Sequence, residues 1–463
     1  MAPFVTLSPH KDFFTTDDGR PFFWLADTWW YALTDRALWP HPFQEMVEKR
    51  VRQGFTVAMV VVGVPPEVPL YSSEANSDGQ HPFLQDFRPN PLYFDAIEKK
   101  VVFMIEHGLV PCLVGGWGHQ MDSVGEERFS LFWKEIIRRF SKYPVVWCLT
   151  GEVDIGTPSL HPSYSFLKQV VSRLPEPVKV SLRTLKHSLF IRPLISTPVT
   201  SERVSQQILS WKKVAEALKD EDKTNKLLLV HPNTQQASSA ILGQPTWLDV
   251  DSIQSGHDPG SRLFMVSEAY QRSKQKIFVN LEPIYEGILG NDDPELQRYA
   301  FWMSILAGAK GHSYGADGLW NMRTADQFLS HWGSTVWNEA LQRPGAEQLG
   351  KAIKWLEESV EWWTLQPSLN AITPHWNSTQ ESIHLPLCAK TANGTIVCYF
   401  PKKRQAKYYV WNDVSKVELT WIDPCTMTLV ESPHYLIDGQ EHRYDLSGTQ
   451  SDLLLIAKPV QSS

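Results

Sequence analysis

Short apolar runs alternate with amphipathic helical patterns through most of this chain, and that alternation restricts its fold more than any other feature. The run from Phe55 to Val62 is continuous and rich in β-branched residues, which is typical of a strand buried on both faces. The stretch from Pro91 to His107 places its apolar residues on one face of a helix. Repeated strand–helix units of this kind predict a parallel sheet covered by helices.

Eight apolar runs can be assigned as strands before the pattern stops. They span residues 21–27, 55–62, 109–116, 144–152, 226–231, 252–257, 277–282 and 311–320, and the predicted helices span 41–54, 91–107, 126–143, 206–218, 261–273, 293–306 and 344–358. We therefore expect an α/β fold, a (β/α)8 TIM barrel over residues 1–365. Residues 155–205 lack a clean alternation, and we treat them as an insertion in the barrel. Neither a G-x-G-x-x-G turn nor a G-x-x-x-x-G-K loop occurs, so phosphate-binding folds lose support.

The pattern changes in residues 366–463. Short apolar or alternating runs, separated by turn residues, span 395–400, 407–411, 416–421 and 452–457. Runs of this length and spacing predict a small all-β sandwich domain after the barrel.

Composition excludes several classes of protein. The net charge of -7 gives no electrostatic basis for binding nucleic acid, and no apolar run is long enough to span a bilayer. Residues 1–14 lack the basic start and apolar core of a secretory signal, so we expect a cytoplasmic protein. The five cysteines include Cys112 and Cys148 inside apolar runs, which favours reduced, buried thiols over a disulfide framework.

Polar and aromatic side chains gather where the predicted strands end. Because the carboxyl ends of barrel strands all face one mouth, we expect these side chains to line a common site. Aromatic residues make up 12% of the chain, and their rings stack well on the C–H faces of sugars, although large domains also use Trp in their cores. The candidate site residues are Asp27, Trp29, Trp30, Trp117, His119, Glu152, His231, Gln254, His257, Glu282, Tyr285, His312, Tyr314 and Trp320.

Two carboxylates in this set end the clearest strands. Glu152 ends the fourth strand, and Glu282 ends the seventh, directly before Pro283. A strand-end Glu can simply be held by a neighbouring Arg or by a backbone N–H. Two carboxylates facing each other among aromatic rings, however, are what glycoside hydrolysis needs, one as proton donor and the other as nucleophile or charge stabiliser. This arrangement would raise the pKa of Glu152.

Other chemistries fit the sequence less well. The histidines at 119, 231, 257 and 312 could join Asp27 in a metal site, but no H-x-H pair ends the first strand and no H-E-x-x-H motif occurs. No G-x-S-x-G elbow is present for a serine nucleophile, and Cys148 lies within a strand. We therefore expect neither a metal nor another cofactor.

Several motifs, in order, resemble the apiosidase-like glycoside hydrolases, glycoside hydrolase family 140, over nearly the whole chain. They are G-R-P-F-F-W-L-A-D-T-W-W (19–30), Arg50 with Gly54 and Phe55, V-V-W-C-L-T-G-E (145–152), H-P-N (231–233), Q-S-G-H (254–257), L-E-P-x-Y-E (281–286) and G-A-K-G-H-S-Y-G-A-D-G-L-W (308–320). The W-I-D-P turn (421–424) resembles the collagen-binding-type β domain that usually follows, a name that is not evidence of collagen binding.

The resemblance implies a catalytic (β/α)8 barrel with an acid/base at the end of strand four and a nucleophilic Glu at strand seven, matching Glu152 and Glu282. It also implies an exo-acting enzyme on plant-derived sugars such as apiose. The family's strand-four motif commonly ends in Gly-Gly-Asp, whereas this chain has Thr150-Gly151-Glu152. A longer acid moves the proton donor by about one C–C bond length, a shift that matters to rate, so the sugar can differ from apiose.

The sequence thus predicts an exo-glycosidase acting with retention on a carbohydrate or glycoside. Asp27, His257, Tyr285 and His312 would orient the sugar beside the two glutamates. One alternative is a glycosidase of the same fold for a different terminal sugar, and another is a carbohydrate-binding pseudoenzyme. A third is a protein-binding β module attached to an inactive barrel. The separation of the two carboxyl groups tests these interpretations.

Overall fold

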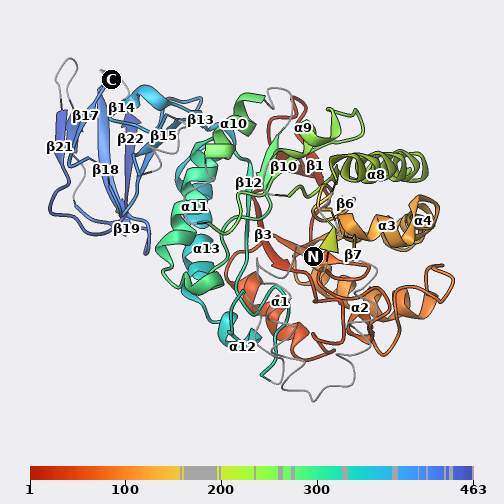
Figure 1. The fold of residues 1–463 in the computed structure, drawn as a ribbon. Helices are drawn as coiled ribbons and strands as arrows, with labels where there is room; N and C mark the ends of the chain where they lie inside the picture. The colour runs from red at the N-terminus through yellow and green to blue at the C-terminus, as the bar shows by residue number, and fades with distance from the viewer. Residues whose placement is uncertain are drawn as a thin grey trace.

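The computed structural model shows a barrel beside a β module (Figure 1). The structure describes residues 1–156, 159–160, 196–197, 200–233, 236–258, 264–272, 277–325, 332–377, 384–404, 406–412, 416–431, 434–436 and 442–460. Most of the insertion expected over 155–205 lies outside these residues. Its described parts include β7 (Ser159–Leu160) and β8 (Ser196–Thr197), which pair antiparallel to each other.

Eight parallel strands form the barrel, as the sequence predicts. They are β3 (Trp24–Trp29), β4 (Val57–Val61), β5 (Val110–Val114), β6 (Val146–Cys148), β9 (Leu228–Leu229), β10 (Asp251–Ile253), β11 (Phe278–Asn280) and β12 (Gly311–Tyr314). Their order in the sheet, β10-β11-β12-β3-β4-β5-β6-β9, is the chain order taken in a circle. At the remaining junction, between β9 and β10, the N–H of Asp249 donates to the carbonyl of Leu228 at 3.0 Å.

Helices surround this sheet (Figure 1). The main ones are α1 (Phe43–Arg52), α2 (Pro91–Glu106), α4 (Glu126–Phe140), α8 (Ser201–Glu221), α10 (Phe264–Arg272), α11 (Glu295–Leu306) and α13 (Pro344–Ser359). The start of α2 follows from local chemistry, because the side chain of Asn90 accepts from the N–H of Leu92 and Pro91 occupies the first turn. Helix α8 begins earlier than its apolar pattern predicts, because Thr200 caps a first turn whose side chains are largely solvent-facing.

The strands are shorter than the apolar runs that predict them. The run over 252–257 yields only the three residues of β10, and the run over 226–231 yields the two of β9. The remaining residues of both runs continue past the strand ends into the loops at the mouth. Gln254, His257 and His231 therefore lie on loops, where their side chains are not committed to the packing between sheet and helices.

Two antiparallel sheets make up the C-terminal module. One contains β13 (Gln366–Pro367), β15 (Leu387–Lys390), β16 (Ile396–Phe400), β22 (Leu453–Pro459), β18 (Val417–Asp423) and β19 (Thr428–Leu429), with β20 (His434–Leu436) also paired to β18. The other contains β14 (Ile372–Thr373), β17 (Tyr408–Trp411) and β21 (His442–Asp445). Phe400 of the first sheet packs against Tyr409 of the second with ring centroids 5.2 Å apart, so the sheets share an apolar core.

The cysteines correct one expectation. Cys112 and Cys148 are free and buried, as the sequence predicts. Cys388 and Cys398, however, form a disulfide bond. They occupy directly opposite positions on β15 and β16, and only the strand register brings them together.

Barrel and β module are joined by buried polar contacts. The guanidinium of Arg298 on α11 binds both carboxylate oxygens of Asp452, at 2.7 and 2.8 Å. The ammonium of Lys310 donates to the carbonyls of Trp363 and Leu365, in the segment that connects the two domains, at 3.0 and 2.8 Å. These contacts hold the module against the barrel.

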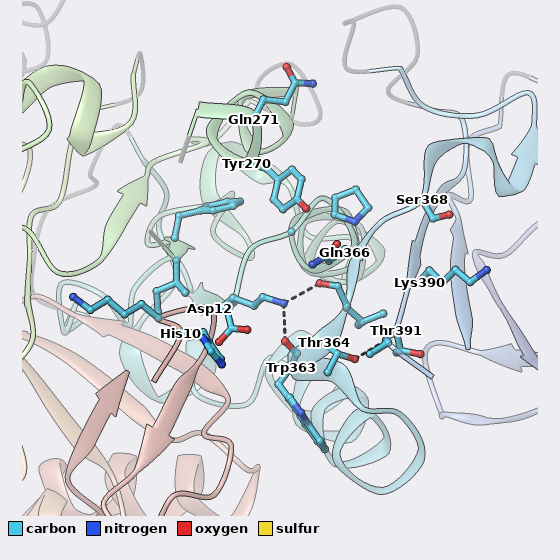
Figure 2. A pocket seen from close by; sticks show the side chains of 18 residues that line it. His10, Asp12, Tyr270, Gln271, Trp363, Thr364, Gln366, Ser368, Lys390 and Thr391 are labelled. Carbon is cyan, nitrogen blue, oxygen red and sulfur yellow. Dashed lines mark hydrogen bonds between the residues drawn. The ribbon is translucent and has the colours of Figure 1, made fainter. Parts of the chain in front are cut away.

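A cavity of about 960 Å³ lies beside this connection (Figure 2). Its lining includes Tyr270 after β10, Phe278 at the start of β11, and Trp363 and Lys390 from the module side. It therefore opens at the end of the barrel where β11 begins, away from the end where the predicted site residues gather.

Among the described residues, no helix is both long and apolar enough to cross a membrane.

Candidate active site

Glu152 and Glu282 meet at the carboxyl end of the barrel. Glu152 follows β6, and Glu282 follows β11. Between them lies Gln254, whose side-chain amide donates to Oε1 of Glu282 at 2.7 Å and to Oε1 of Glu152 at 3.3 Å. Because one nitrogen contacts both oxygens, those oxygens are at most about 6 Å apart, which is near the about 5–5.5 Å carboxyl separation of retaining glycosidases.

Glu282 is surrounded by groups that favour its ionised form. Nε2 of His231 lies 3.3 Å from Oε2, and Nε2 of His257 lies 3.2 Å from Oε1. Burial acts to raise the pKa of Glu282, but the hydrogen bonds and charges of the two histidines outweigh it and hold the pKa well below the usual range. Burial acts to lower the pKa of His231, while Glu282 raises it, with a net upward shift. Glu282 is therefore an anion at neutral pH, as a nucleophile requires.

Glu152 has the opposite environment. Burial raises its pKa to about 6, and the negative charge of Glu282 adds to this shift. Nε1 of Trp117 donates to Oε2 of Glu152 at 2.9 Å, which opposes the shift in part. A carboxyl group with a raised pKa beside an ionised one is the division that a proton donor and a nucleophile need.

The backbone at Glu152 is adapted to this position. Its φ of 41° is in the left-handed region, which non-glycine residues seldom adopt and which is common at functional sites. A Cβ at Gly118 would lie 2.1 Å from the carbonyl oxygen of Glu152, and a Cβ at Gly151 would lie 2.2 Å from the ring of Trp117. Glycine at both positions therefore allows Trp117 and Glu152 to approach each other.

Aromatic rings enclose the pair on two sides. Trp30 packs against Trp117 and His231, with ring centroids 5.2 and 5.7 Å apart. On the other side, Tyr285 packs against His257 at 4.5 Å. Burial, with the charge of Glu282 next, raises the pKa of Tyr285 well above its usual value, so its hydroxyl stays protonated beside the carboxylate. These rings give the site the apolar walls that sugar recognition uses.

Three candidate site residues, two of them expected to orient the sugar, lie elsewhere. Asp27 is buried and pairs with Arg50 at 2.6 Å. Tyr314 donates to Glu286 at 2.6 Å, and His312 packs against Phe301 of α11 at 5.5 Å. Asp27, His312 and Tyr314 lie on strands whose alternate side chains point outward to the helices, so the structure does not bring these three to the glutamate pair.

Three further candidates stand apart from the described contacts of the pair. Trp29 is fully buried on β3, and Trp320 packs against Tyr31 at 6.1 Å. His119 lies in η2 (Gly118–Gln120), close to Trp117 in sequence, and burial lowers its pKa. The candidates brought to the pair are therefore Trp30, Trp117, His231, Gln254, His257 and Tyr285.

Trp332 is a residue of this region that the sequence patterns do not indicate. Its ring packs edge-on against His257 at 5.7 Å, and its Nε1 donates to Glu67 at 2.9 Å. It lies outside every predicted element, and only the tertiary fold places it next to a histidine that binds Glu282. The described part of the chain contains no group of three or more His, Cys, Asp or Glu side chains that could hold a metal ion.

Comparison with known proteins gives a match to one family model and similarities to solved structures. Residues 8–364 match the family model described as "Apiosidase-like, catalytic domain". A solved structure named "Glycoside hydrolase" is similar with a TM-score of 0.75 and 17% identity, covering 100% of this chain and 99% of the other. A glycoside hydrolase family 5 structure from Bacteroides vulgatus has a TM-score of 0.73 and 18% identity, with 100% and 96% covered. A search of curated proteins found no match.

Proposed function

Because the chain belongs to the apiosidase-like family and is a glycoside hydrolase, we propose that it removes a terminal sugar with retention of anomeric configuration. The sugar is apiose or another plant-derived sugar, released from a glycoside or a polysaccharide side chain. One observation supports the stereochemical part of this proposal: Glu152 and Glu282 share one amide donor, so their Oε1 atoms are at most about 6 Å apart, whereas the carboxyl groups of inverting enzymes are about 6.5–9.5 Å apart.

Retention requires two steps. In the first, Glu282 attacks the anomeric carbon, the glycosidic C–O bond breaks, and the proton of Glu152 passes to the leaving oxygen. In the second, water attacks the anomeric carbon, Glu152 takes a proton from that water, and the bond to Glu282 breaks. The low pKa of Glu282 and the raised pKa of Glu152 suit the protonation states with which the cycle begins.

Family membership supports the exo mode of action and a furanose such as apiose. The acid at 152 is a glutamate where the family commonly has an aspartate, and this difference favours a sugar or linkage that places the leaving oxygen slightly further from β6. The panel of substrates should therefore extend beyond apiosides.

The test is a panel of aryl glycosides, apiosides included, with the first-formed anomer identified by NMR. We expect hydrolysis with retention, and we expect Glu282→Gln to lose activity by more than about 10³-fold. Glu152→Ala should lose less activity on a dinitrophenyl glycoside, which needs no proton donor, and azide should partly restore its turnover. Undiminished activity in Glu282→Gln would refute the assignment of Glu282 as the nucleophile, and a first product of inverted configuration would refute the retaining mechanism. Wild-type protein that binds sugars without cleaving them would be a pseudoenzyme.

A further inference from the structure

Gln254 has an unusual position between the two glutamates. It is 3% exposed, and both hydrogen bonds described for its side chain run from one amide nitrogen to catalytic carboxylate oxygens. An NH₂ group carries two hydrogens, so it can donate to both oxygens at once. Within the described part of the chain its carbonyl oxygen has no partner. Contacts to the rest of the barrel thus do not explain the placement of this amide.

We propose that Gln254 is a positioning residue that serves both half-reactions, its amide remaining bound to whichever glutamate carries the negative charge. This inference rests on the proposed retaining function. It assigns Gln254 a role towards the enzyme's own carboxylates, in addition to any contact with the sugar.

The need for such a donor follows from the movement of charge during the cycle. In the free enzyme, the anion is Glu282 and Glu152 holds the proton. After the first step, Glu282 is bonded to the anomeric carbon as a neutral ester, and Glu152, having given its proton to the leaving group, is the anion. In the second step, the proton of water goes to Glu152, and Glu282 becomes the anion again. The pair therefore carries one negative charge throughout, which moves from one side of Gln254 to the other.

The distances fit the first of these states. The amide lies 2.7 Å from the oxygen of Glu282 and 3.3 Å from that of Glu152, so it is closer to the carboxylate that is ionised in the free enzyme. A small rotation of the side chain would shorten the second contact when the charge moves. His231 and His257 contact only Glu282 of the two, and Trp117 contacts only Glu152, so Gln254 is the described side chain with hydrogen bonds to both.

The decisive variant is Gln254→Met, which keeps the side-chain length and removes both donors. Its two steps are separated by rapid-mixing kinetics on the dinitrophenyl glycoside of whichever sugar the wild-type enzyme hydrolyses. Release of dinitrophenol reports the first step, and turnover of the glycosyl-enzyme reports the second. We expect both rate constants to fall by about 10²-fold, as when one preorganised donor to a developing charge is removed.

Gln348→Met is the matched control. Gln348 is also a buried glutamine, but it accepts from Arg298 near the β module. The proposal is supported if both variants lose a similar amount of unfolding free energy but only Gln254→Met has lower rate constants for the two steps. Slowing of only one step, or of neither, overturns it. If the wild-type enzyme cleaves no glycoside, the proposed function fails first, and this outcome is distinct from an active enzyme that is insensitive to Gln254→Met.

Discussion

At the scale of single residues, two chemically identical side chains have been given opposite properties. Glu282 has a histidine beside each of its oxygens, whereas the described donors to Glu152 are one indole and the shared amide of Gln254, so burial and the charge of Glu282 prevail there. The pKa values of the two carboxyls separate because the positive partners all gather on one side. This difference in environment is the basis of the catalytic roles that we propose for the two glutamates.

The pH dependence follows from that separation. Glu152 must be protonated for the first step, so kcat/KM on a substrate with a poor leaving group should fall as pH rises through about 6. Trp117 donates to the ionised form of Glu152, so Trp117→Phe should raise the pKa of Glu152. The decrease in kcat/KM should then occur at higher pH. Trp355→Phe, a change in α13 far from the pair, should not move it. A decrease in kcat/KM that moves to lower pH in Trp117→Phe would contradict the assignment of Glu152 as the acid.

At the scale of elements, the loops after β5 and β6 are built around close backbone approach. The N–H of Gly118 donates to the carbonyl of Gly151 at 2.7 Å, and the N–H of Gly151 donates to the carbonyl of Gly116 at 2.9 Å. These two loops form one unit that carries both Trp117 and Glu152. Its geometry depends on the absence of a side chain at residue 151.

Gly151→Ala tests this dependence. The added methyl group would lie 2.2 Å from the ring of Trp117, so the ring or the loop must move. We expect kcat to fall by about 10²-fold, because misplacement on the scale of 1 Å has effects of that size. Gly448→Ala, where nothing lies within 4 Å of the new methyl, is the control and should retain full activity. Equal activity in both variants would show that the loops tolerate a methyl group at residue 151 and would contradict this dependence.

At the scale of the whole molecule, the β module is tied to the barrel by a buried ion pair. The side chains of Arg298 and Asp452 are 8% and 2% exposed, and Tyr399 donates to the same carboxylate at 3.0 Å. Helix α11 carries Arg298 and also follows the loop that leads from Glu282. The module thus supports the outside of the helix that packs beside β11 and β12.

Removing one member of this ion pair should lower the free energy of unfolding. Asp452→Ala leaves the guanidinium of Arg298 buried without its counterion, which typically destabilises a protein by about 3–5 kcal/mol. Urea unfolding should show this loss, and the double variant Arg298→Met/Asp452→Leu should recover a large part of it. A single variant as stable as the wild type would show that water reaches the pair.

The barrel and the module after it could be predicted from the sequence, and the two glutamates could be selected from it as candidates, because periodic burial and strand-end carboxylates are local patterns. It could not decide which strand-end side chains face the mouth, since a shift of one residue along a strand turns a side chain to the opposite face. Only the tertiary structure therefore separates Gln254, which joins the glutamates, from Asp27, which pairs with Arg50 behind the sheet. Trp332 and the Cys388–Cys398 bond depend on the same long-range placement, since no local pattern records which distant segments meet.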